Sequence, residues 1–219
     1  LVRSRGLGDL YKRQGAGYVS FFGTIGVTDE LGGLDVNATT AGTGDITFKG
    51  NIGKVANPGV VGVTKIGTAT GATTDTENVH FLGTLYSFDG GATTIAADGS
   101  ETDDETIELG TTGNNIEFKA AGEALTFVGG KLDLVNNTNL TINSGGGNVT
   151  VPGIAGVSDE TVTIEASAGA VSLGAVGDSG HTEIHELDID GAGGITLTGN
   201  IYTSGDCLLY TSPSPRDRT

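Results

Sequence analysis

The stretch LDVNATTAGTGDITFKGNI, Leu34–Ile52, contains two short segments in which apolar and polar residues alternate, separated by a turn rich in Thr and Gly. Alternation places the apolar side chains on one face of a β-strand and the polar ones on the other. LDIDGAGGITLTGNI at Leu187–Ile201 repeats this pattern, and LDLVNNTNLTI at Leu132–Ile142 repeats part of it. A unit this small cannot bury its own apolar face, so we expect the copies to stack on one another.

The same signal runs along most of the chain, in segments such as NVHFLG, NIEFKA, ALTFVG, NVTVPG and TVTIEA, and no window has helical periodicity. We predict an all-β fold: a right-handed parallel β-helix (β-solenoid) with about 20–25 residues per coil and about eight or nine coils. The alternative is an antiparallel β-sandwich. Aromatic residues make up only 5% of the chain, which predicts no large aromatic core and disfavours the sandwich. Residues 54–77 and 97–105 depart from the pattern and are expected to be loops or insertions.

The two ends of the chain differ from the rest. When Ser4–Gln14 is back-translated with valine in place of Leu10, the reverse complement of that DNA encodes CLLYTSPSPR, Cys207–Arg216. The shared DNA resembles the adapter of transposase-based sequencing libraries. We therefore interpret residues 1–14 and 207–219 as translated adapter and not native, and residues 15–206 as an internal fragment that forms the β-solenoid repeat region.

Composition excludes several classes of partner. The whole chain has a net charge of −16, and because the two tails together carry +4, residues 15–206 carry −20 without a single arginine or cysteine. Nucleic acid is excluded because binding phosphates requires cationic side chains, and disulfide or thiol chemistry is excluded as well. No apolar run reaches the roughly 18 residues needed to span a bilayer, so we expect no membrane insertion by this fragment.

The Gly-rich, Cys-free repeats GDITFKGNI and GGITLTGNI resemble the passenger repeats of large bacterial surface proteins of the filamentous-haemagglutinin and autotransporter-adhesin group, over most of residues 34–205. The resemblance implies a non-catalytic segment of an exported adhesin or filament that acts as elongated binding or spacer repeats. It also implies an extracellular or cell-surface location and a host-cell, glycan or matrix surface as the partner. Unpaired backbone groups of the strands at the two ends of the solenoid would favour end-to-end self-association. Two alternatives stay open: a carbohydrate-active β-helix enzyme, such as a polysaccharide hydrolase, and a surface-layer structural module with the sandwich fold.

Two motifs resemble catalytic or metal sites, but we interpret both as structural. GDSGH at Gly177–His181 resembles the nucleophile loop of trypsin-like proteases, yet the only histidine before it is His80, in an ordinary strand pattern, and a triad needs both a base and a carboxylate. HTEIHE places His181, Glu183 and His185 on one face of a predicted strand, but zinc sites need three or four converging ligands. We therefore expect no catalytic residues and no cofactor.

The acidic loop DGSETDDE is the one candidate metal site. Asp98, Glu101, Asp103, Asp104 and Glu105 bring five carboxylates together, and calcium accepts clustered oxygen ligands. The loop lacks the spacing of an EF-hand, so a solvated acidic turn is the preferred interpretation and weak calcium binding is the alternative.

Threonines recur at outward strand positions, and a flat threonine ladder is a candidate surface for binding ice. The threonines in question are Thr47, Thr126, Thr141, Thr150, Thr163 and Thr196. Threonine also simply favours strands. In the linear sequence the ladder is interrupted by His80, Glu117, Asp133, Ser172 and Asp188, which argues against the hypothesis.

Overall fold

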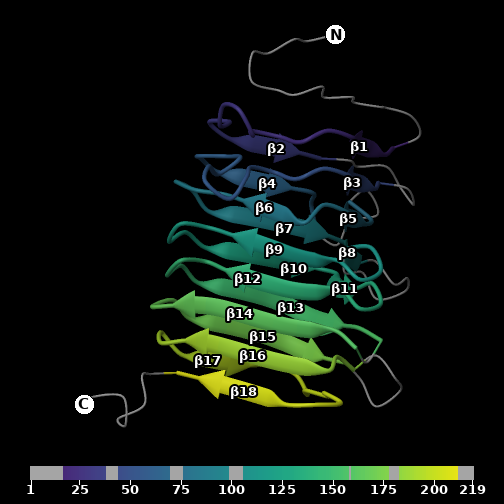
Figure 1. Cartoon of the computed structure of the whole chain (residues 1–219), viewed down its shortest axis with the longest axis vertical. Helices are drawn as coiled ribbons and strands as arrows, with labels where there is room; N and C mark the ends of the chain where they lie inside the picture. The colour runs from purple at the N-terminus through teal and green to yellow at the C-terminus, as the bar shows by residue number, and fades with distance from the viewer. Residues whose placement is uncertain are drawn as a thin grey trace.

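The computed structural model describes residues 17–37, 44–69, 76–98, 106–157, 159–177 and 183–211, and this part of the chain contains eighteen strands and no helix. Every pair of named strands is parallel, and the strands wind into a stack of coils (Figure 1). The β-solenoid is therefore confirmed, and the antiparallel sandwich is wrong.

Each coil has three faces, which we number in chain order. Face 1 is formed by β1 (Val19–Phe21), β3 (Ile46–Phe48), β5 (Val79–Phe81), β8 (Thr106–Leu109) and β11 (Lys131–Leu134). Face 2 is formed by β6 (Leu85–Ser87), β9 (Asn115–Lys119), β12 (Asn139–Asn143), β14 (Thr161–Ser167), β16 (Glu186–Gly191) and β18 (Cys207–Tyr210). Face 3 is formed by β2 (Leu34–Val36), β4 (Thr64–Ile66), β7 (Thr93–Ala97), β10 (Leu125–Gly129) and β17 (Ile195–Leu197), together with the first halves of β13 (Val149–Ala155) and β15 (Val171–Val176). The second halves of β13 and β15 continue into face 1 of the next coil.

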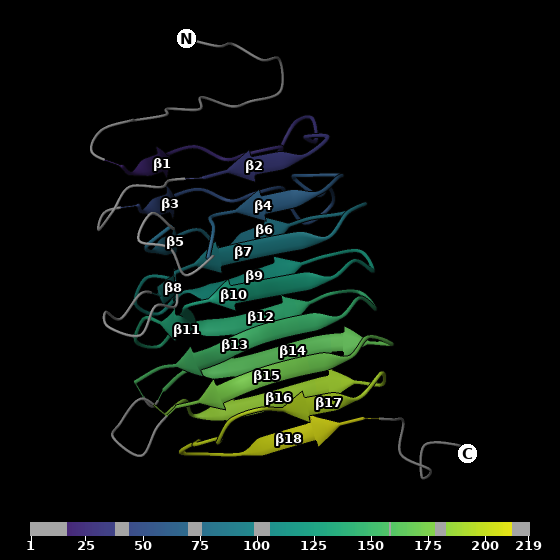
Figure 2. The same cartoon turned by 180° about the vertical axis from the view of Figure 1, so that it is seen from behind.

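The coil is right-handed. In Figure 1 the strands of face 2 lie nearer the viewer and run to the left while the chain descends from its N-terminal end. Figure 2 shows the rod from behind, where the strands of face 3 are nearer and also run to the left. In each view, the chain runs to the left on the side nearer the viewer as it descends. This is a right-handed coil, the hand expected of connections between parallel strands.

The core lies inside the coil and is built by inward residues that stack on the equivalent residues of neighbouring coils. On face 2 the successive inward residues are Ile25, Ile52, Tyr86, Phe118, Ile142, Ile164 and Ile189, one for each of seven coils, and all are buried. Burying one side chain of this size contributes about 1.5–3 kcal/mol. β18 follows as part of an eighth coil, and its four residues are all exposed.

Within residues 15–206 the described chain forms seven coils rather than the expected eight or nine, because the coils are not uniform. The stretch of chain from Ile52 to Tyr86, its bridge partner in the next coil, is much longer than the stretch from Val149 to its partner Val171. Residues 54–77 contain β4 as well as the turn at Lys54–Asn57, so the prediction of a loop or insertion there was partly wrong. Most of 97–105 lies outside the described residues.

The three copies of the sequence motif do not stack on one another, contrary to expectation. Leu34–Val36 lies on face 3, Leu132–Leu134 on face 1 and Leu187–Ile189 on face 2. Each copy is a strand, a corner and the next strand, and the copies occupy three different corners of the coil. The repeat therefore encodes one way of turning a corner rather than one complete coil.

Glycine is required at the corner between faces 2 and 3, where consecutive coils approach closely. A Cβ atom at Gly169 would collide with the backbone carbonyl of Gly147 in the preceding coil, and one at Gly193 would lie 2.7 Å from the carbonyl carbon of Gly169. Real Cβ atoms do not approach backbone this closely, so these corners exclude every other residue type unless the coils move apart.

Asparagine joins the coils where a strand begins. Asn139 Nδ2 donates to Asn115 Oδ1 (3.1 Å), and the backbone amide and hydroxyl of Thr161 both donate to Asn139 Oδ1 (3.1 and 2.8 Å). Asn148 Oδ1 likewise accepts from the amide of Ala170 in the next coil. These bonds satisfy the polar groups of the coil corners and hold neighbouring coils in register.

Candidate functional site

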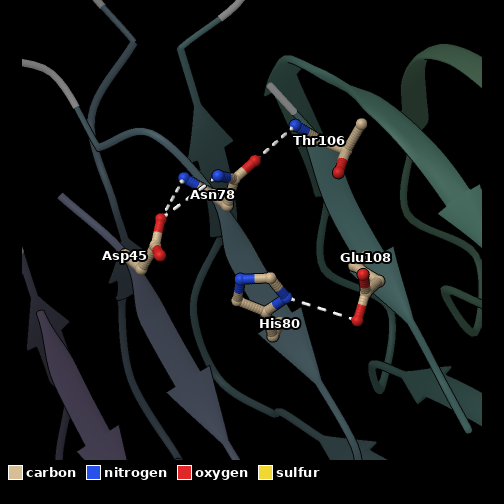
Figure 3. Close-up of polar contacts among 5 residues, drawn as sticks. All are labelled: Asp45, Asn78, His80, Thr106 and Glu108. Atoms are coloured by element: carbon tan, nitrogen blue, oxygen red, sulfur yellow. Dashed lines mark hydrogen bonds and ion pairs between the residues drawn. The ribbon is translucent and has the colours of Figure 1, made fainter. Parts of the chain in front are cut away.

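A polar ladder crosses three coils of face 1 (Figure 3). Asp45 Oδ1 accepts hydrogen bonds from the backbone amide and the Nδ2 of Asn78, both at 3.2 Å, and Asn78 Oδ1 accepts from the amide of Thr106 at 3.0 Å. The three residues immediately precede or begin β3, β5 and β8, so the parallel register brings them together. The ladder uses the polar groups of these side chains to connect coils.

Beside this ladder lies the only histidine–carboxylate pair in the described part of the chain. His80 Nδ1 is 3.4 Å from Glu108 Oε1, with about a quarter of the histidine side chain exposed (25%). Thr47 and Asp133 occupy the flanking positions of the same outward row, which therefore runs Thr47, His80, Glu108, Asp133. A histidine held by a carboxylate can act as a base, but nucleophilic catalysis also requires a nucleophile within hydrogen-bonding reach. No hydrogen bond joins Thr47 to His80 in the described structure.

His80 is far from the GDSGH motif. On face 1, His80 pairs with Glu108, Glu108 with Asp133, and Asp133 with Ala155, each one coil further on. Gly177 follows Val176, which lies one coil beyond Ala155. Four coil steps separate the start of the motif from His80, or about 19 Å at the usual spacing of strands. Residues 178–182 lie outside the described residues.

HTEIHE is not a continuous strand face. β16 begins only at Glu186, and before it Ile184 makes an isolated bridge to Thr203. The Nδ1 of His185 lies 3.4 Å from the hydroxyl of Ser204, and Glu183 is partly exposed. His181 lies outside the described residues. Ile184 is buried between the partly exposed Glu183 and the exposed His185, so the alternation is kept over the described residues although they precede β16.

The acidic loop is described only at its first residue. Asp98 follows β7, and its backbone amide donates to the carbonyl of Thr76 (2.6 Å). Glu101, Asp103, Asp104 and Glu105 lie outside the described residues, so weak calcium binding stays a prediction. Elsewhere, among the residues that the structure describes, no group of three or more His, Cys, Asp or Glu side chains is arranged to hold a metal ion.

Sequence reasoning missed the buried carboxylate of Glu160. Its Oε1 accepts from the amide of Asn137 (3.1 Å), and its Oε2 accepts from the amides of Val157 (2.8 Å) and Asp159 (3.2 Å). The side chain is fully buried, and the three donors come from two adjacent coils. Three N–H donors compensate the desolvation of a buried carboxylate, so Glu160 is a structural link. In the sequence it reads as one more acidic residue in a polar turn.

The structure separates the outward threonines onto different faces. Thr47 lies on face 1, and Thr141 and Thr163 pair with each other on face 2. On face 3, Thr126 pairs with Thr150, and Thr196 belongs to the same column two coils further on.

No family model, curated protein or solved structure matches this chain. In the described part of the chain, no helix is long and apolar enough to cross a membrane.

Proposed function

We propose that this chain is a non-catalytic segment of an exported bacterial surface adhesin or filament, in which the solenoid acts as elongated binding or spacer repeats. The observation that carries the proposal is the continuous parallel stacking of the coils, reinforced by side-chain ladders such as Asp45–Asn78–Thr106 and Asn115–Asn139–Thr161. Each further coil adds about 4.8 Å to a rod of this kind without requiring a new core.

The proposed partner is a host-cell, glycan or matrix surface, and the proposed location is extracellular or on the cell surface. A rod offers many equivalent outward positions, so contacts repeated on successive coils give avidity from individually weak interactions. The net charge of −16 favours solubility and repels acidic polymers such as nucleic acids.

Binding without turnover tests this function. The full chain, immobilised on beads, is offered neutral, acidic and sulfated glycans and matrix-coated particles. We expect retention on at least one of these surfaces with no release of soluble sugar. A disordered polypeptide with the same net charge, immobilised on the same beads, controls for electrostatic retention. Retention equal to that of this control polypeptide on every surface would contradict the adhesin proposal.

A polysaccharide hydrolase is the second candidate, and the register of Glu108 and Asp133 on face 1 favours it. Glycosidases use two carboxyl groups, about 5–5.5 Å apart in retaining enzymes, and neighbouring strands bring outward residues to a comparable spacing. Release of reducing ends by the wild type, abolished in Glu108→Gln and Asp133→Asn, would replace the adhesin proposal. The same activity in both variants would point to a contaminant.

The third candidate role is a surface-layer structural module. It was predicted with a sandwich fold, which the chain does not have, but self-assembly of the solenoid can still be tested. Light scattering over a concentration series measures end-to-end self-association of the rod. Growth in mass with concentration would favour a filament, and a constant monomer mass would favour a spacer that acts as part of a longer chain.

A further inference from the structure

Face 3 carries an uncharged outward surface from β7 to β17. One column on this face consists of Thr94, Thr126, Thr150, Ser172 and Thr196, which are paired one to one in successive coils. Two positions later in each strand stand Ala96, Val128, Pro152, Gly174 and Thr198; Ala96 and Gly174 are buried, and the other three are partly or fully exposed. None of the eight exposed or partly exposed positions in these two columns carries a charge, in a chain with 27 acidic residues and a net charge of −16.

The charges that interrupt the threonines in the linear sequence lie on the other two faces. His80 and Asp133 are on face 1, in the row that contains Glu108. Glu117 and Asp188 are on face 2, in the row that contains Thr141 and Thr163. Of the five interruptions only Ser172 falls within the column on face 3, and serine keeps the hydroxyl. The sequence argument against a continuous ladder therefore does not hold once the residues are assigned to faces.

The uncharged surface is regular and supported from below. Its pairing from Thr94 to Thr126 and from Thr150 to Thr196 has no bulge, so the hydroxyls repeat at about the 4.8 Å spacing of parallel strands. The inward residues next to the column, Ile95, Phe127, Val151 and Leu173, are at most 2% exposed and hold these strands in the core. Figure 2 shows β7, β10, β13 and β15 side by side along this side of the rod.

The chemistry of the surface selects a neutral, periodic ligand. In the described part of the chain, the hydroxyls of Thr126 and Thr150 have no protein partner, so both are available to donate to and accept from water. Each threonine also carries a methyl group, and the neighbouring column adds the apolar side chains of Val128 and Pro152. The strands from β7 to β17 offer charged ligands no outward counter-charge, and outward aromatic rings, which would stack on sugar rings, are absent from these strands.

We propose that face 3, between β7 and β17, binds ice. A repeating array of hydroxyl and methyl groups on a rigid sheet holds its first water layer in fixed positions, and an ice crystal offers a neutral lattice of O–H donors and acceptors to that layer. Charged side chains would instead hold their own hydration shells, and none lies on a face 3 strand from β7 to β17; the uncharged surface ends at β4, where Lys65 pairs with Thr94. This activity is independent of whether the rod belongs to an adhesin.

The experiment uses the full chain and two matched pairs of substitutions. Thr126→Lys with Thr150→Lys changes two paired residues of face 3, and Thr141→Lys with Thr163→Lys changes two paired residues of face 2. All four positions are partly exposed strand threonines, so both double variants should fold alike, and circular dichroism and thermal melting verify this. Each protein is mixed with a non-binding reference protein in dilute solution, a fraction of the water is frozen slowly, and the ratio of the two proteins in the ice is measured.

We expect the wild type and the face 2 variant to be enriched in the ice relative to the reference protein and the face 3 variant to lose this enrichment. Absence of enrichment of the folded wild type overturns the proposal, and so does an equal loss in both variants. If only one double variant fails to fold, the wild-type result still decides. Two other results would also overturn ice binding. Sedimentation of the protein with crystalline cellulose but not with ice would assign face 3 to a polysaccharide. A wild-type dimer that dissociates in the Thr126→Lys, Thr150→Lys variant would assign face 3 to a second copy of the chain.

Discussion

The first four coils and the last three are built by the same stacking rule but differ in size and in filling. In the N-terminal part a long stretch of chain separates the bridge partners Ile52 and Tyr86, whereas Val149 and its partner Val171 in the C-terminal part are much closer in sequence. The long coils contain a continuous aromatic stack, and the short coils have an aliphatic core. The comparison shows that one stacking rule accommodates coils of different length and cores of either aromatic or aliphatic side chains.

The aromatic stack runs through the whole N-terminal part. The rings of Phe21 and Phe48 are 4.8 Å apart and those of Phe48 and Phe81 are 5.3 Å apart, both stacked. Phe118 then makes edge contacts with Phe81 (5.1 Å) and Phe127 (5.2 Å). The low aromatic content was therefore misleading, because most of the few aromatic residues are gathered in one part of the core.

Removing the centre of this stack should have the largest effect. We expect Phe118→Ala to lower the free energy of unfolding by about 3–5 kcal/mol, because Phe118 contacts Phe81, Tyr86 and Phe127. Its partner in the next coil, Ile142, provides the comparison: Ile142→Val should cost only about 0.5–1.5 kcal/mol. Urea unfolding followed by circular dichroism measures both. Equal costs would mean that the rings do not carry the core of the long coils.

The corner glycines offer a second comparison between the two parts. Gly169→Ala places a Cβ against the carbonyl of Gly147 and should cost about 1–3 kcal/mol. Gly32→Ala in the first coil meets no atom within 4 Å and should be neutral or slightly stabilising. Thermal melting of the two variants decides. If both melt like the wild type, the short coils are not as tightly stacked as described.

Glu160 tests how the short coils are joined. We expect Glu160→Ala to cost about 1–3 kcal/mol, because it leaves buried backbone amides without an acceptor. The control is Glu165→Ala, which removes a partly exposed contact to Asn143 Nδ2 (2.6 Å) and should cost less than about 1 kcal/mol. Chemical unfolding of both variants gives the difference, and a larger cost at Glu165 would reverse our assignment.

The smallest expected effect is a gain in the stability of the long coils. Thr64 and Thr93 face inward and pair with each other, and among the described residues their buried hydroxyls have no hydrogen-bond partner. Thr93→Val replaces the hydroxyl by a methyl group of similar shape and should raise stability by about 1 kcal/mol. Differential scanning calorimetry measures the shift. A lower melting temperature would indicate that the hydroxyl has a partner, such as a buried water.

Sequence alone was sufficient for most of the strands of the second half of the chain and for the parallel coiled architecture, but not for β4 or for which segments stack. Alternation identified Ile46–Phe48, Val79–Phe81 and Leu140–Ile142, because a half-buried strand imposes a period of two. The grouping of strands into coils was not predictable, because the same corner motif serves three different corners and loops change the length of each coil. The same limit applies to the candidate sites: Glu160 and the threonine column depend on which coils lie beside one another.

The central claim is that residues paired in successive coils lie side by side on one face. Cysteine cross-linking tests it directly in a Cys207→Ser background, because a disulfide needs Cα atoms about 4.4–6.8 Å apart. Thr141 and Thr163 pair in adjacent coils, whereas Asp188 lies one coil beyond Thr163. The account predicts that Thr141→Cys with Thr163→Cys oxidises to an intramolecular disulfide and that Thr141→Cys with Asp188→Cys does not. The reverse result, or cross-linking of neither pair in the folded protein, would contradict it.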